Sequence, residues 1–176
     1  GKKAGAYFLK HPDQLIKIVK ELRTSIKIPF FAKIRSGWDE NSVNALELSQ
    51  NLEKEGIDAI ALHPRTKVDG YSKKADWKLV NTVRKSLEIP LILSGDVFNA
   101  HSAAKAFSVT GCKFTMIGRA ARVNPSVFSQ LNSLLESNSK PSEPFRTYSK
   151  NEVDPYKDFL DFLELYKTRE DRNLFN

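Results

Sequence analysis

Four short apolar runs of this sequence each end in side chains or glycines that can hold a ligand. Glycine lets a backbone approach a phosphate closely, the following amides can donate to its oxygens, and arginine adds a bidentate donor. A lysine at a strand end places a cation beside a ring that gains negative charge, and histidine can donate to the ligand. The residues concerned are Lys33, Arg35, His63, Arg65, Ser94, Gly95, Asp96, Gly118 and Arg119. Together they predict a site for a planar, anionic ligand.

Each of these residues also has a structural interpretation. Lys33 and Arg35 can pair with carboxylates at the rim of the sheet, and His63 can be a satisfied rim histidine. Asp96 can cap the next helix within a tight turn. Four strand ends that all carry such residues favour a ligand site, because a purely structural sheet does not require them.

The elements that must position this site follow an alternating pattern. Apolar runs without polar alternation indicate buried parallel strands, and they occupy Ile28–Ile34, Ile57–Leu62, Ile89–Leu93 and Phe114–Ile117. Helical spacing of apolar residues predicts helices over 12–24, 42–55, 76–87 and 99–109. This order is typical of an α/β fold with right-handed crossovers. The pattern fits part of a barrel and an open doubly wound sheet equally well.

The last part of the chain differs in character. Asn124-Pro125 predicts a helix start, 137–149 is polar and predicts a linker, and Asp154-Pro155 begins another apolar helical pattern. The chain starts at Gly1, and its length of 176 residues is short of the roughly 250 that a complete (β/α)₈ barrel needs. We therefore expect a processed chain or a fragment.

Charge and composition narrow the function. The net charge is +7, and the excess lies in residues 1–38, which hold nine basic and two acidic side chains. Such a segment attracts polyanions such as RNA, although a solvated helix face has the same composition. No run of about 18 apolar residues predicts a membrane span, and no Cys/His cluster predicts a metal site. The single cysteine, Cys112, precedes a strand and is expected to be an inert core residue in a cytoplasmic protein.

At this point the motifs resemble those of the tRNA-dihydrouridine synthases. The matching segments are Ala4–Ala6, FAKIRSGW at 31–38, ALHPRT at 61–66, LSGDV at 93–97, MIGRAA at 116–121 and NPSVF at 124–128. The resemblance implies that residues 1–136 form the FMN-binding, C-terminal half of a TIM-type (β/α)₈ barrel with parallel strands. Residues 150–176 would then begin a truncated helical tRNA-binding domain.

The resemblance also implies an activity. Reduced FMN, recharged by NADPH, would pass hydride to a uracil ring in tRNA. Arg35, Arg65, Lys2 and Lys3 are expected to face the RNA. The residues expected to bind FMN are Lys33, His63, Ser94, Gly95, Asp96, Gly118 and Arg119.

The sequence departs from the family pattern at several positions. Ser94 stands where the family usually has asparagine, and Pro64 where glycine is commoner. The family's catalytic cysteine would fall upstream of Gly1, so no catalytic residue is assigned here and the chain alone is expected to be inactive. Its exposed barrel edges are expected to self-associate. Two alternatives remain open: another FMN- or phosphate-binding barrel oxidoreductase, and a non-catalytic RNA-binding module.

Overall fold

A computed structural model describes residues 4–137 of the chain. The chain divides into two compact units, which are considered separately. The first comprises Gly1–Val97 and His101–Ile117, and the second comprises Phe98–Ala100 and Gly118–Asn176. Lys2, Lys3, the predicted helical domain at 150–176 and, except for Ser137, the predicted linker lie outside the described residues.

The first unit contains a four-stranded parallel sheet in the order β1-β2-β3-β4. The strands are β1 (Phe31–Arg35), β2 (Ala59–His63), β3 (Leu91–Ser94) and β4 (Phe114–Met116). The strand order follows the chain without a reversal. A doubly wound sheet needs a reversal at its switch point, whereas a barrel is built from consecutive strands. The observed order is therefore that of a segment of a (β/α) barrel.

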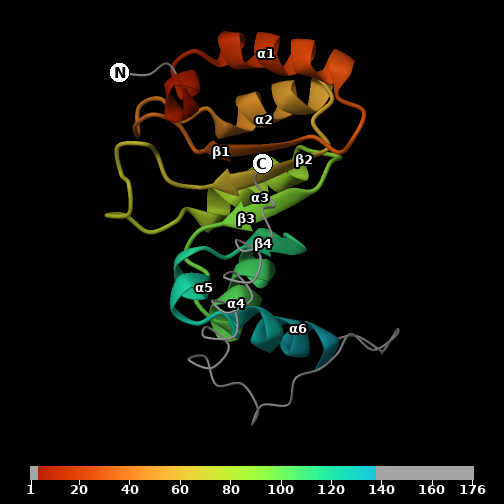
Figure 1. Ribbon diagram of the computed structural model, residues 1–176. Helices are drawn as coiled ribbons and strands as arrows, with labels where there is room; N and C mark the ends of the chain where they lie inside the picture. The colour runs from red at the N-terminus through yellow and green to blue at the C-terminus, as the bar shows by residue number, and fades with distance from the viewer. Residues whose placement is uncertain (1–3, 138–176) are drawn as a thin grey trace, which may run out of the picture. The chain divides into compact units, whose positions relative to one another are not determined.

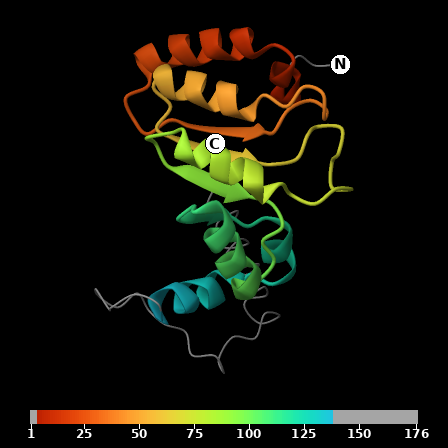
Figure 2. The ribbon, with the colours of Figure 1, turned by 180° about the vertical axis from the view of Figure 1, so that it is seen from behind.

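Helices precede the first strand and connect the strands of this sheet. They are the 3₁₀ helix η1 (Gly5–Leu9) and the α-helices α1 (Pro12–Ser25), α2 (Ala45–Lys54), α3 (Trp77–Lys85) and α4 (Ala100–Thr110). In Figures 1 and 2, α2 and α3 run along one face of the sheet, and α1 lies beside α2. The second unit contains α5 (Arg119–Val123) and α6 (Val127–Ser137).

The two faces of the sheet differ in burial because side chains alternate along each strand. Ile34, Leu62 and Leu93 lie under the helices and are at most 7% exposed. On the opposite face, Phe31 and Phe114 are 60% and 54% exposed. The expectation of strands buried on both faces is thus correct only for β2, and the other strands alternate because no described element of this unit covers their second face.

The first strand begins later than its apolar run predicts. Ile28 is 73% exposed, and pairing starts only at Phe31. The backbone of Phe30 donates to the Asp58 carboxylate at 2.7 Å and accepts from the Asp58 amide at 2.8 Å. This exchange sets the register, because it fixes residue 30 opposite residue 58 before the ladder begins.

Local signals explain where the helices begin and end. Pro12 occupies the first turn of α1, and the Asp76 side chain caps α3 by accepting from two backbone amides. Gly111 follows α4 with a φ of 68°, a conformation that favours glycine. The short elements η1 and α5 were not predicted, because five residues are too few to show helical periodicity. No helix in the described range could span a membrane.

Because helices cover only one face of the sheet, we predict that substitutions on the two faces of β3 differ in their effect on stability. Leu93→Ala removes a fully buried side chain and is expected to lower the free energy of unfolding by about 2–5 kcal/mol. Ile92→Ala, at the neighbouring half-buried position on the open face, should cost clearly less. Urea unfolding followed by circular dichroism compares the two variants. Equal losses would contradict the assignment of an open and a covered face.

Candidate functional site

The carboxyl ends of β1, β2 and β3 bring predicted site residues onto one face of the sheet. Arg35 pairs in register with His63, and Leu62 pairs with Leu93, which places Ser94 beside His63. Lys33 lies two residues before Arg35 and therefore projects from the same face. This is the open face, so ligand-binding side chains and accessible space coincide there.

Lys33 is an exposed lysine with no hydrogen bond or ion pair to any residue in the described range. Its pKa is lowered from the ordinary lysine value by partial burial and by the nearby positive charge of Arg35. Arg35 donates to the Thr66 carbonyl at 2.9 Å. The sequence left open that Lys33 and Arg35 pair with carboxylates. Among the described residues, neither of them does. An anionic ligand would relieve their repulsion.

Arg65 is the most buried charged residue near this edge, with 4% exposure. Both oxygens of the Asp96 carboxylate accept from its Nη2 at 2.7 Å. Its Nε donates to the Lys73 carbonyl at 2.5 Å. These contacts join the loops that follow β2 and β3. The guanidinium therefore contacts protein atoms. Its contact with RNA remains a prediction.

His63 is 6% exposed, and its Nε2 lies 3.3 Å from Nη1 of Arg65. A guanidinium has donors but no acceptor, so Nε2 must be the accepting nitrogen of this contact. A neutral imidazole then carries its proton on Nδ1. Arg65 thus selects the tautomer of His63.

Gly95 and Asp96 form a tight turn directly after β3. Gly95 has a φ of 126°, and a side-chain carbon there would lie 3.0 Å from Cδ2 of His63. Glycine is therefore required both by the backbone and by the histidine. Asp96 also has a positive φ, 57°, and accepts from the Ala75 amide at 2.8 Å in addition to Arg65. The strain of this turn is offset by these contacts of the carboxylate.

Gly118 and Arg119 belong to the second unit. No protein atom lies within 4 Å of a side-chain carbon built on Gly118, so its neighbours do not require a glycine. The Arg119 guanidinium lies 5.3 Å from the ring of Phe98 in the same unit. Their predicted role at a phosphate remains a prediction.

Two aromatic residues near the site were not assigned a role from sequence. Tyr71 is 61% exposed, and its ring lies 6.0 Å from that of His63. Trp38 follows β1 and is contacted by the ammonium groups of Lys10 and Lys67. Trp38 lies within the motif at residues 31–38, but nothing in its spacing indicated the two lysines.

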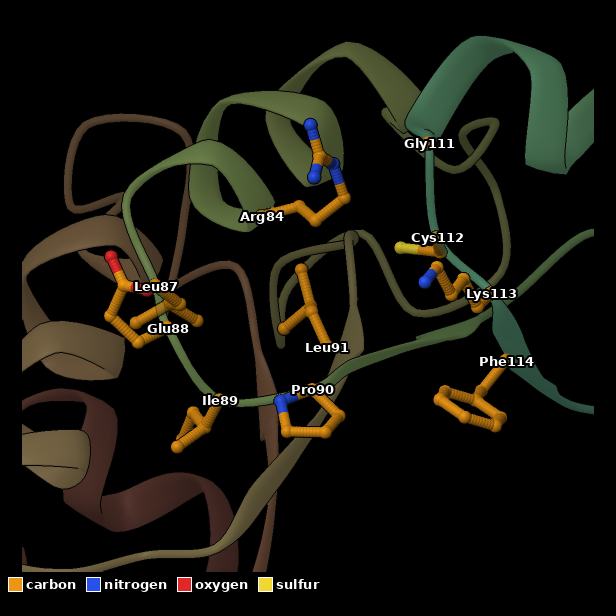
Figure 3. Close-up of a pocket in the computed structure, with 10 residues that line it drawn as sticks. All are labelled: Arg84, Leu87, Glu88, Ile89, Pro90, Leu91, Gly111, Cys112, Lys113 and Phe114. Atoms are coloured by element: carbon orange, nitrogen blue, oxygen red, sulfur yellow. The ribbon is translucent and has the colours of Figure 1, made fainter.

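A cavity of about 350 Å³ lies at the opposite, amino ends of β3 and β4 (Figure 3). Leu87, Leu91 and Cys112 contribute to its lining. Cys112 is 5% exposed, and burial raises the pKa of its thiol, which favours the unreactive protonated form. This agrees with the predicted core role of Cys112. Among the residues described, no cluster of histidine, cysteine and acidic side chains could hold a metal ion.

The sequence is similar to a known protein family. The model of the dihydrouridine synthase (Dus) family matches residues 1–168. A probable tRNA-dihydrouridine synthase of Rhodobacter capsulatus is 31% identical over 141 residues, which are 80% of this chain and 44% of that protein. The tRNA-dihydrouridine synthase B of Pasteurella multocida is 34% identical over 143 residues, or 81% of this chain and 43% of that protein. The chain thus spans less than half the length of these relatives.

A solved structure shows a similar fold. In the crystal structure of the Amycolatopsis orientalis BexX/CysO complex, one chain matches with a TM-score of 0.52 and 17% identity. The match covers 77% of this chain and 54% of that chain. At this identity the likeness concerns the fold alone.

We expect the buried ion pair between Arg65 and Asp96 to stabilise the fold. Asp96→Asn keeps the shape of the side chain and tolerates the positive φ, but it leaves the charge of Arg65 without its partner. We expect the free energy of unfolding to fall by roughly 3 kcal/mol, measured by urea denaturation. The double variant Arg65→Met, Asp96→Asn removes the stranded charge and should recover part of this loss. A double variant less stable than Asp96→Asn would contradict the assigned pairing.

Proposed function

Because the chain belongs to the dihydrouridine synthase family, we propose that it forms the FMN-binding part of an enzyme that reduces uridine to dihydrouridine in tRNA, with NADPH as reductant. The observation that carries this proposal is the open sheet face, where Lys33, Arg35 and His63 project from adjacent strand ends. The names of the relatives support the reaction, and the short match to them makes it a proposal.

The side chains on the open face fit a flavin. When bound and reduced, FMN supplies the hydride. Lys33 would face the flavin ring, because its ammonium has no acidic partner among the described residues and sits where negative charge would be stabilised. Lys33 is therefore proposed to bind and orient the ring.

Residues around His63 would complete the cofactor site. Nε2 of His63 faces Arg65, and the imidazole is proposed to bind a polar atom of the flavin at the carboxyl end of β2. Ser94 would contribute its hydroxyl, and the Gly95-Asp96 turn would contribute its backbone. Gly118 and Arg119 are proposed to bind the FMN phosphate, in keeping with the open space beside Gly118. Arg65 acts as a positioning residue for His63 in this scheme.

The proposed partner is tRNA. Arg35 is the described member of the predicted RNA-facing set that lies on the open face, and Lys2 and Lys3 belong to the same basic segment of the sequence. A cytoplasmic location follows from this substrate and is part of the proposal. The catalytic cysteine is proposed to lie outside this chain, since Cys112 is buried at the amino end of the sheet.

The flavin proposal is tested by visible absorption after FMN is added and unbound FMN is removed. The wild-type chain should retain flavin, and Lys33→Ala should retain much less because it loses the cation beside the ring. Lys113→Ala, an exposed lysine at the amino end of β4, is the charge-matched control and should behave as the wild type. Equal retention in the two variants, or a wild type without flavin, would contradict the proposed site.

Self-association is a separate part of the proposal. The open face exposes Phe31, Phe114 and Met116, and β1 and β4 each pair with one described strand only. We expect sedimentation velocity to show species larger than the 19.9 kDa monomer. Phe114→Lys, which charges the open face at an edge strand, should shift the distribution toward the monomer. A monodisperse wild-type monomer would contradict self-association.

A further inference from the structure

Two lysines from distant segments place their ammonium groups on the same tryptophan ring. Nζ of Lys10 lies 4.2 Å from the centroid of the Trp38 ring, and Nζ of Lys67 lies 4.9 Å from it. Lys10 follows η1, Trp38 follows β1, and Lys67 lies in the loop after β2. We refer to these three residues as the Trp38 clamp.

Backbone hydrogen bonds hold the clamp in place. The Lys67 amide donates to the Gly37 carbonyl at 2.9 Å, and the Val68 amide donates to the Trp38 carbonyl at 3.0 Å. These bonds tie the loop after β2 to the loop after β1. The side-chain amide of Asn44 donates to the Leu9 carbonyl at 2.9 Å, which anchors the residue before Lys10. The geometry of the clamp therefore does not depend on its exposed side chains alone.

Gly37 allows the Trp38 loop to fold this tightly. A side-chain carbon at residue 37 would lie 2.3 Å from the Ser42 carbonyl oxygen and 2.7 Å from Cα of Val43. Both neighbours are backbone atoms, and residues 37 and 43 form a β-bridge. The loop is thus packed against itself, and Trp38 projects from a rigid base.

The charge of the clamp is not neutralised by the described part of the protein. Lys10 and Lys67 are exposed and form no ion pair with any described acidic residue. Lys73, in the same loop as Lys67, shows the opposite arrangement, because it pairs with Glu40 at 2.9 Å and with Asp69 at 3.1 Å. Each cation–π contact holds an ammonium group at the ring, and its positive charge has no acidic partner among the described residues. An anionic group bound beside these lysines would offset that charge.

The position of the clamp indicates which anion would bind. Trp38 and Lys67 follow the carboxyl ends of β1 and β2, where Lys33, Arg35 and His63 also lie. Tyr71, four residues after Lys67, exposes its ring beside His63. A nucleic-acid strand carries phosphates at regular intervals with planar bases between them, so one phosphate can bind the clamp while a neighbouring base reaches the aromatic edge of the site.

We propose that the Trp38 clamp binds a backbone phosphate of an RNA strand close to the nucleotide that enters the site. This inference rests on the proposed function, since that function makes RNA the occupant. The clamp would position the strand and contribute little sequence preference, because phosphate contacts carry no base information. Lys10 and Lys67 would supply the charge, and Trp38 would hold the two ammonium groups in a fixed place.

The test is fluorescence anisotropy of a labelled single-stranded oligouridylate titrated with the 176-residue chain, without flavin or NADPH, over a series of salt concentrations. Lys10→Ala and Lys67→Ala should each weaken binding by roughly 3- to 10-fold. Each should also reduce the slope of log K against log salt by about 0.7, the value for one single-strand phosphate contact. Lys85→Ala removes one exposed lysine from the last turn of α3, away from the clamp, and is the charge-matched control.

Variants at Trp38 separate the clamp from general electrostatics. Trp38→Leu keeps both lysines but removes the ring and should weaken binding, whereas Trp38→Phe keeps an aromatic face and should bind more tightly than Trp38→Leu. Circular dichroism confirms that each variant is folded.

The outcomes distinguish this inference from the proposed function. If the wild type binds RNA and the lysine variants at the clamp behave as Lys85→Ala does, the clamp is overturned while the RNA partner stands. If the wild type does not bind RNA, both fail. Flavin retention, measured separately, does not enter this test.

Discussion

The ion pair between Arg65 and Asp96 fixes the arrangement of the proposed site. It joins loops that follow adjacent strands, and its guanidinium is 4% exposed. Burying two charges is costly, and here the cost is offset by two contacts from one nitrogen to the carboxylate, by the Lys73 carbonyl and by the Ala75 amide. The tautomer of His63 and the turn at Gly95 both depend on this pair, because Arg65 contacts the first and Asp96 belongs to the second.

The site also needs space that a ligand can reach. The sheet provides this space because helices cover only one of its faces. The helices bury Ile34, Leu62 and Leu93 on one face and leave the cations of β1 on the other. A strand can thus stabilise the fold with alternate residues and present ligand-binding groups with the rest. In a closed barrel the same face would line the interior, with the ligand at the carboxyl ends of the strands.

The sequence predicted the strands, the connecting helices and the clustering of Lys33, His63 and Ser94, because hydrophobic periodicity and strand order are local properties. It did not predict the pairing of Arg65 with Asp96, since the two residues are 31 positions apart and no pattern links them. Gly95 was predicted as a phosphate-binding glycine. The structure gives it a conformational cause as well, a positive φ and close contact with His63.

The Trp38 clamp could not be predicted from the sequence either, because it depends on contacts between distant segments. Excess positive charge in residues 1–38 was visible in the composition, but composition cannot show which lysines remain without acidic partners. Lys10 and Lys67 are distinguished from Lys73 only by tertiary contacts. Residues 1–38 therefore indicated an affinity for polyanions, and the folded loops indicate where an anion would be held.

We propose that FMN binds at the carboxyl ends of these strands. The most direct test of this proposal is a titration of the isotopically labelled chain with FMN, followed by amide chemical shifts in two-dimensional NMR. The account predicts changes concentrated at Lys33, His63, Gly95 and Asp96, with little change at the amino-end cavity around Leu91 and Cys112. Changes concentrated at that cavity, or no changes at saturating FMN, would contradict it.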